Sequence, residues 1–140
     1  MPFSQLPVST LLLCSIAAAA VLIYVPFLVV GYARLKVGYD MAAPRAAFDK
    51  LPAYGQRATW AHQNAFEAFM LYAAAALMAY VTRQDTPTVA IVTLIFPIAR
   101  LFYALFYIFN VPIARSLAYV VGSFCIGTLM WVSVSSALPH

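Results

Sequence analysis

The chain has 140 residues, of which 65% are hydrophobic and only 9% are charged, and its formal net charge is +4. Soluble domains carry roughly 25% charged residues, so the composition excludes a water-soluble globular domain. The mean hydropathy of +0.90 also indicates an integral membrane protein. A chain of this length suits one compact unit rather than two domains.

Four apolar segments are each long enough to cross a bilayer as a helix, which needs about 20 apolar residues. They cover residues 8–30, 61–81, 88–109 and 117–138. None of them alternates apolar and polar residues as the strands of a membrane barrel do. The sequence therefore predicts an all-α membrane protein, a bundle of four transmembrane helices that forms a single domain over residues 1–140.

Prolines mark both kinks and helix starts in this pattern. Pro26 and Pro97 lie within two of the spans, where they should kink the helix and leave a carbonyl for neighbouring groups to satisfy. Pro87 and Pro112 instead follow short turns, and they are predicted to lie at the starts of the third and fourth helices. The one long polar loop covers residues 31–56.

Basic residues collect on one side of the predicted bundle. The first and third loops share that side, and their Lys and Arg residues are Arg34, Lys36, Arg45, Lys50, Arg57 and Arg115. The second loop carries only Arg83. The positive-inside rule therefore predicts that loops one and three are cytoplasmic and that both termini are outside, in a bacterial inner membrane. The same charges would also attract anionic lipid head groups.

The two cysteines predict neither a disulfide nor a metal site. Cys14 and Cys125 both lie within apolar runs, without a CxxC motif or a His/Cys cluster. No motif for nucleotides, haem or nucleic acid is found. We therefore expect no metal and no nucleic-acid partner, and we expect the lipid bilayer to be the main surrounding of the protein.

Polar side chains share one face on each of three predicted helices, toward their cytoplasmic ends. They are Arg57, Trp60, Asn64 and Glu67 in the second helix, Arg100, Tyr103 and Tyr107 in the third, and Arg115 and Tyr119 in the fourth. His62 points away from the face of the second helix. A bundle can turn the three faces toward one another.

An arginine within a span is costly and needs a partner. A lone arginine at a helix centre costs about 2.5–3.5 kcal/mol on the insertion scale, and Glu67 is the only acid placed to meet Arg100. One interpretation is an internal Glu67–Arg100 ion pair that merely holds the bundle together. However, Arg57, Arg100 and Arg115 face this single carboxylate, and the excess of cations favours a pocket for a small anionic ligand bound by arginine forks.

The tyrosines have a second interpretation. Tyrosine is enriched at membrane interfaces, where it anchors helices without taking part in any site. That alternative suits Tyr119, and it suits Tyr103 less well because of its spacing from Arg100.

Three segments together resemble the signature of a known membrane family. They are AHQNAFE at residues 61–67, the stripe of Arg100, Tyr103 and Tyr107, and PIARSLAY at residues 112–119. In this order they are similar to the membrane-associated proteins in eicosanoid and glutathione metabolism (MAPEG), here of bacterial type. That family includes leukotriene C synthase, microsomal glutathione transferase and microsomal prostaglandin E synthase. The resemblance implies a four-helix protomer, usually in a homotrimer, with glutathione bound between adjacent protomers near the cytoplasmic side.

The resemblance also implies roles for individual residues. Arg34 and Arg100 would hold the carboxylates of glutathione, and Glu67 would take its amino group with Asn64 nearby. Arg115 would stabilise the thiolate and act as a catalytic residue. The remaining candidates are Tyr103 as a second catalytic residue, and Arg57, Tyr107 and Tyr119 in binding.

One position departs from the family pattern. Many members have an arginine where this chain has Trp60, four residues before Asn64. Arg57 lies one turn earlier on the same face and is the candidate to replace the missing cation. Without a replacement, the site would bind glutathione weakly, bind another thiol, or have lost catalysis.

The activity that the resemblance implies is that of a glutathione-dependent transferase or peroxidase. A thiolate would attack a lipophilic small-molecule substrate from the bilayer, either an electrophile or a lipid hydroperoxide. Only a thiolate attacks well, and a neighbouring arginine favours that form by opposite charge. Two alternatives stay open: a non-catalytic scaffold or regulatory subunit of the same fold, which Trp60 favours, and a transporter or channel subunit that passes anions along the cationic stripe.

Overall fold

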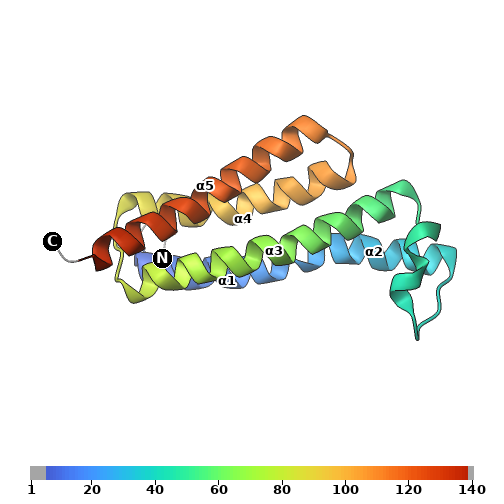
Figure 1. Cartoon of the computed structure of the whole chain (residues 1–140), viewed down its shortest axis with the longest axis horizontal. Helices are drawn as coiled ribbons and strands as arrows, with labels where there is room; N and C mark the ends of the chain where they lie inside the picture. The colour runs from blue at the N-terminus through green and yellow to red at the C-terminus, as the bar shows by residue number, and fades with distance from the viewer. Residues whose placement is uncertain (1–5, 139–140) are drawn as a thin grey trace.

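The computed structural model describes residues 6–138 as an elongated bundle of helices (Figure 1). The elements are α1 (Val8–Leu22), α2 (Tyr24–Val37), the short 3-10 helix η2 (Pro44–Lys50), α3 (Ala53–Val81), α4 (Pro87–Ile108) and α5 (Pro112–Ala137). Because α1 and α2 form one interrupted rod, four helices are long and apolar enough to cross a membrane. The predicted all-α, four-helix membrane architecture is confirmed.

Next to the first and third loops, the helices begin and end at other residues than the hydropathy predicted. The first rod continues to Val37, beyond residue 30, and α3 begins at Ala53, before residue 61. The fourth span likewise begins at Pro112 instead of residue 117. Hydropathy marks only the residues that suit the hydrocarbon core, whereas the hydrogen bonds of a helix continue into the polar interface.

Loops one and three lie at the same end of the bundle. The connection from α2 through η2 to α3 and the turn between α4 and α5 lie at one end, and the start of α1, the end of α5 and the α3–α4 turn lie at the other (Figure 1). We call the first of these the basic end, because six of the eight Lys and Arg residues belong to it: Arg34, Lys36, Arg45, Lys50, Arg57 and Arg115.

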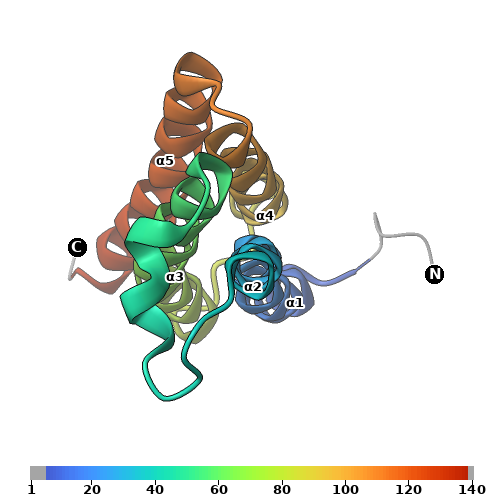
Figure 2. The same cartoon turned by 90° about the vertical axis from the view of Figure 1, so that its right-hand side faces the viewer.

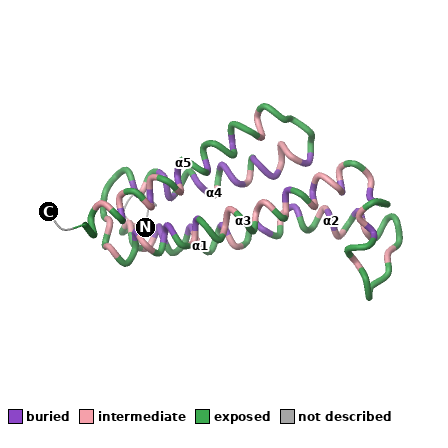
Figure 3. Tube along the Cα trace, viewed as in Figure 1, coloured by how far each residue is buried: buried purple, intermediate pink, exposed green. Residues whose placement is uncertain are grey.

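The helices surround a narrow core. In the view along the bundle, α3 and α4 lie between α5 and the α1–α2 rod, and α3 and α4 contact every other rod (Figure 2). Buried residues follow the lines where helices meet, and the outer faces are exposed (Figure 3). Large apolar side chains such as Leu28, Phe124 and Trp131 are at least 70% exposed. Such a surface is stable in lipid or against another subunit.

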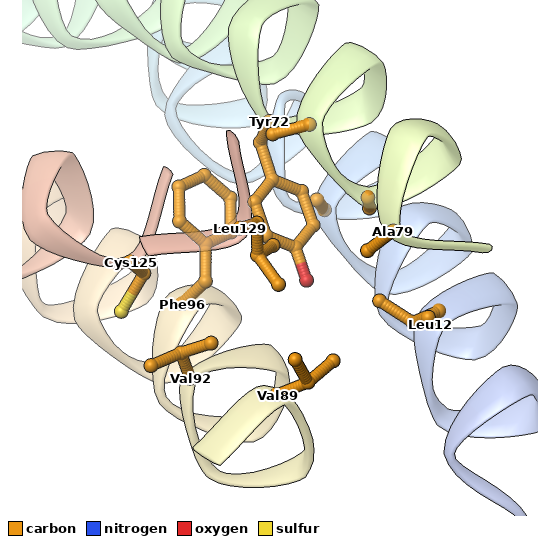
Figure 4. Close-up of a cluster of buried hydrophobic side chains, with 11 residues drawn as sticks. Leu12, Tyr72, Ala79, Val89, Val92, Phe96, Cys125 and Leu129 are labelled. Carbon is orange, nitrogen blue, oxygen red and sulfur yellow. The ribbon is translucent and has the colours of Figure 1, made fainter. Parts of the chain in front are cut away.

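Tyr72 joins three helices in the middle of the core (Figure 4). Its ring stacks on Phe96, with centroids 3.6 Å apart and planes within 2°. Its hydroxyl donates to Ser15 Oγ at 2.6 Å and lies 3.4 Å from the carbonyl oxygen of Thr93. The Thr93 carbonyl is the one that Pro97 cannot bond, because proline has no N–H. Tyr72 therefore partners a carbonyl that the proline frees, and α4 continues through Pro97.

A histidine from α3 bonds to the backbone at the break in the first rod. The helix is interrupted at Ile23, next to Leu22, whose carbonyl is the one that Pro26 cannot bond. Nδ1 of His62 lies 2.9 Å from the carbonyl oxygen of Ile23 and hydrogen-bonds to it. His62 thus faces the α1–α2 rod, away from the polar face of α3, as the sequence predicted.

We expect Tyr72→Phe to destabilise the bundle by about 0.5–2 kcal/mol, because the Ser15 and Thr93 oxygens lose a hydrogen-bond partner within the membrane. The measurement is thermal unfolding in detergent. Tyr80→Phe is the matched control, since Tyr80 is on the same helix but is 41% exposed. Equal melting temperatures for the two variants would show that the Tyr72 hydroxyl contributes nothing.

Candidate functional site

Asn64 forms a bridge between Arg100 and Glu67. Arg100 is only 8% exposed, and its Nη2 donates to Asn64 Oδ1 at 2.7 Å and to the Asn64 carbonyl oxygen at 3.3 Å. Asn64 Nδ2 in turn donates to Glu67 Oε2 at 3.3 Å. The direct Glu67–Arg100 ion pair considered from the sequence is therefore replaced, in the described part of the chain, by an amide bridge. The short Asn64 side chain is one turn from Glu67 and lies between the two charges.

Arg100 in α4 and Arg115 in α5 each lie over a tyrosine ring. Arg100 Cζ lies 4.2 Å from the ring centroid of Tyr103, and Arg115 Cζ lies 4.7 Å from that of Tyr107. The two rings meet edge to face with centroids 5.6 Å apart, and the Tyr119 ring lies 6.2 Å from Tyr103. Such cation–π contacts contribute about 0.5–2 kcal/mol each. The structure thus brings together five of the predicted residues in one cluster.

Two depressions open on either side of Asn64 and Glu67. The first, which we call the aromatic pocket, has a volume of about 410 Å³ and is lined by Trp60, Gln63, Asn64, Glu67, Tyr103 and Tyr107. The second, the inner groove, has a volume of about 120 Å³ and runs between α3, α4 and α5. The inner groove shares Asn64 and Glu67 with the aromatic pocket. Its lining also includes Arg100, Tyr119 and small or apolar residues such as Leu71, Phe96 and Ser123. A ligand at Glu67 can therefore reach a polar and an apolar region.

Arg57 bonds to the end of α4 and is not among the residues that line the aromatic pocket. Its Nε donates to the carbonyl oxygen of Ile108 at 2.9 Å, at the last residue of α4. The final carbonyls of a helix lack intrahelical donors, so a cation there caps the helix and meets its dipole. The Trp60 ring packs beside two other rings, with its centroid 5.7 Å from that of Phe48 and 6.5 Å from that of Tyr107.

Arg34 lies apart from this cluster. It lines a separate basic pocket of about 350 Å³ between α2, η2 and α3, together with Arg45, Phe48, His62 and Gln63. Its Nε is buried and has no hydrogen-bond partner among residues 6–138. The basic pocket shares Gln63 with the aromatic pocket, but it contains neither Asn64 nor Glu67.

A model described as the MAPEG family matches residues 11–135 of the chain, which is most of its length. The chain belongs to the MAPEG family. A search of curated proteins finds no match, and a search of solved structures also finds none. Members of this family are membrane proteins of glutathione-related transfer and peroxidase chemistry, and they generally use glutathione as a substrate. This MAPEG protein is therefore an integral, multi-pass membrane protein whose helices lie in a lipid bilayer.

Some pocket residues of this MAPEG protein had no clear signal in its sequence. Gln63 belongs to the AHQNAFE segment and lines the aromatic pocket, but the predicted polar face through Asn64 did not include it. Ser123 follows Gly122 in the fourth span, and this pair of small residues was the available signal for a groove. Phe48 is in the first loop, where only the folded packing places it against Trp60.

The titratable and sulfur-containing residues outside the cluster are dispersed in this MAPEG protein. Within residues 6–138, no group of three or more His, Cys, Asp or Glu side chains is arranged to hold a metal ion. Cys14 is exposed and Cys125 is buried, and both are free thiols. The candidate site consequently consists of arginine, tyrosine, amide and carboxylate groups.

We expect Arg57→Ala in this MAPEG protein to reduce stability rather than ligand affinity. The loss of a charged hydrogen bond to the Ile108 carbonyl should cost about 1.5–3 kcal/mol, and it should be visible as a lower melting temperature in detergent. Lys50→Ala is the control, since Lys50 is exposed at the same end. If Arg57→Ala instead loses glutathione binding at unchanged stability, Arg57 belongs to the binding site.

Proposed function

We propose that this protein is a membrane glutathione-dependent transferase or peroxidase. Its lipophilic substrate, an electrophile or a lipid hydroperoxide, arrives from the bilayer. The observation that carries the proposal is the Arg100–Asn64–Glu67 bridge beside two arginine–tyrosine stacks. A fixed cation and a fixed carboxylate complement the zwitterionic end of glutathione, with Glu67 toward the amino group and Arg100 toward a carboxylate.

Arg115 is the proposed thiolate-stabilising residue. It lies in the first turn of α5, where its own charge and the helix dipole both favour an anion. The low dielectric of a membrane site strengthens this effect. The Tyr103 hydroxyl is the proposed second donor to the sulfur. Both groups supply stabilisation and orientation, and the sulfur supplies the nucleophile.

The proposed site would support two reactions, conjugation of a thiol and reduction of a hydroperoxide. In the transferase reaction, the thiolate sulfur attacks a carbon of an epoxide, so that a C–S bond forms, a C–O bond breaks and the oxygen takes up a proton. With an activated alkene, a C–S bond forms and the adjacent carbon is protonated. In the peroxidase reaction, two thiols reduce one hydroperoxide, and the products are a disulfide, an alcohol and water.

The proposed site is completed by a second subunit. Arg34 lines the basic pocket, and Glu67 lines the aromatic pocket further around α3. Small exposed residues, Ala17, Ala18 and Ala74, leave room for close helix contacts between subunits. A homotrimer would place the basic pocket of one protomer beside the aromatic pocket of the next. Under the positive-inside rule, the basic end would be cytoplasmic, in a bacterial inner membrane with both termini outside.

Calorimetry of glutathione binding to the detergent-purified protein, followed by a conjugation assay with a lipophilic epoxide, tests the proposal. We expect saturable binding and glutathione-dependent turnover. A stable oligomer that binds no thiol would contradict the proposal and support a scaffold of the same fold, which the Trp60 position favours. Anion flux in liposomes without thiol binding would support a channel or transporter subunit.

A further inference from the structure

A pocket at the opposite end of the bundle from Arg115 combines apolar and charged groups. This turn pocket, as we call it, has a volume of about 550 Å³ and lies between the start of α1, the last turn of α3 and the α3–α4 turn (Figure 1). Val8, Leu12 and Ala79 are among its apolar lining residues, and Arg83 and Asp85 are the charged ones among those described. Its volume is within the range of small-molecule sites, about 300–1,000 Å³.

Hydrogen bonds to two helices fix the α3–α4 turn beside this pocket. The backbone N–H of Gln84 donates to the carbonyl oxygen of Ala79 at 2.9 Å, and its Nε2 donates to Ser136 Oγ on α5 at 2.7 Å. Arg83 precedes this glutamine with a φ of 54°, and Asp85 follows it. The two charged residues are therefore held on either side of a residue that bonds to both α3 and α5.

The two charges of the turn pocket have opposite signs and are both accessible. The side chains of Arg83 and Asp85 are exposed, and an ion pair between two exposed side chains contributes too little to keep a ligand out. A guanidinium binds a phosphate through two parallel hydrogen bonds, and a carboxylate accepts hydrogen bonds from a primary ammonium. The pair thus complements a ligand that carries a phosphate and an ammonium close together.

The position of the turn pocket in the bundle indicates which ligand carries these groups. One span ends at Val81 and the next begins at Pro87, so the charged turn between them lies at the level of the lipid head groups. Leu12 is four residues inside the first span, so the pocket continues from this level toward the hydrocarbon. A phospholipid presents its polar and apolar parts in the same order.

We propose that the turn pocket binds phosphatidylethanolamine, with the phosphate at Arg83, the ammonium at Asp85 and an acyl chain along the apolar side between α1 and α3. Phosphatidylcholine has the same phosphate and the same net charge, but its quaternary ammonium has no N–H to donate to Asp85. Asp85 therefore sets the preference between these two lipids. This site is separate from the proposed reaction, because Arg115 is in the first turn of α5 at the other end of the bundle.

Native mass spectrometry of the delipidated, assembled protein with added lipids tests the proposal. The probes are phosphatidylethanolamine and phosphatidylcholine with the same acyl chains, and glycerophosphoethanolamine, which is the head group without chains. We expect phosphatidylethanolamine to bind about fivefold more tightly than phosphatidylcholine. The head group without chains should bind about tenfold more weakly than the lipid, because it buries no apolar surface beside Leu12. Equal binding of the two lipids, or of the lipid and its chain-free head group, would overturn the proposal.

Three variants assign the lipid preference to the turn pocket. Asp85→Asn should reduce the preference for phosphatidylethanolamine to within about twofold, because a neutral amide does not attract the ammonium. Asp49→Asn is the matched control, since it removes an exposed carboxylate at the basic end and should keep the wild-type preference. Arg83→Asn should weaken both lipids by about fivefold, and asparagine tolerates the positive φ at this position. A wild-type preference in Asp85→Asn, or unchanged affinities in Arg83→Asn, would contradict the proposed site.

The same variants distinguish a lipid from a neighbouring subunit as the occupant of the turn pocket. If a second copy of the chain covers the pocket, Arg83→Asn and Asp85→Asn should promote dissociation of the oligomer in detergent and leave lipid binding as it is in the wild-type protein. That result would overturn the lipid site. A lipid site instead predicts unchanged oligomer stability in delipidated samples and a loss of lipid binding in Arg83→Asn.

Discussion

Arg115→Ala is expected to lower the turnover number for glutathione conjugation by a factor on the order of 10²–10³, the usual effect of removing one group that stabilises a developing or reactive anion. The affinity for glutathione should change much less, because the Arg100–Asn64–Glu67 bridge is on other helices and stays intact. The measurement is steady-state kinetics with a lipophilic epoxide, paired with calorimetry.

Two controls make the Arg115 experiment specific. Arg115→Lys keeps the charge, so it should retain part of the activity that Arg115→Ala loses. Arg83→Asn removes an arginine at the opposite end of the bundle, and asparagine tolerates the positive φ of 54° at that position. Arg83→Asn should leave turnover unchanged. Full turnover in Arg115→Ala would contradict the proposal that Arg115 stabilises the thiolate.

Arg100→Gln is expected to weaken glutathione binding by about 10- to 100-fold, since a charged hydrogen bond contributes about 1.5–3 kcal/mol. The stability of the bundle should hold or rise, because the change removes a buried charge from a membrane helix. The measurements are calorimetry with glutathione and thermal unfolding of the same detergent sample.

The Arg100 result distinguishes a binding site from a structural contact. If Arg100 merely holds α3 to α4 through Asn64, its loss should lower the melting temperature and leave the affinity of the remaining folded protein unchanged. Arg100→Lys keeps a cation without the planar guanidinium fork. Its affinity for glutathione should therefore lie between the affinities of the wild-type protein and of Arg100→Gln. An unchanged affinity in Arg100→Gln would remove this residue from the proposed site.

Hydropathy and helical periodicity predicted most of this fold. Each expected span contains a helix, and Pro87 and Pro112 lie at the starts of α4 and α5. The helix ends at the basic end were not predicted, because the amphipathic residues that continue α3 back to Ala53 are no more apolar than a loop. The side chains that bond to carbonyls near the two internal prolines, Tyr72 at Thr93 and His62 at Ile23, come from another helix, and only packing brings them there.

The candidate site was predicted as a set of residues but not as a geometry. Spacing alone placed Asn64 with Glu67 and Arg100 with Tyr103, because these pairs are one turn apart on a helix. Spacing does not determine the rotation of α3 relative to α4. That rotation places Asn64 between Arg100 and Glu67, where it bonds to both. Spacing also does not show that Arg57 turns to the end of α4. Nor does spacing predict the aromatic pocket, where Glu67 is the one charged residue among the described lining residues.

A structure of the assembled protein with bound glutathione would show whether Arg100 and Arg115 hold one ligand. We expect a thiol bound between protomers, with its amino group at Glu67 beside Trp60, a carboxylate toward Arg100 and its sulfur beside Arg115. Glutathione bound elsewhere, with Arg100 and Arg115 directed toward lipid and no common ligand between them, would contradict this expectation.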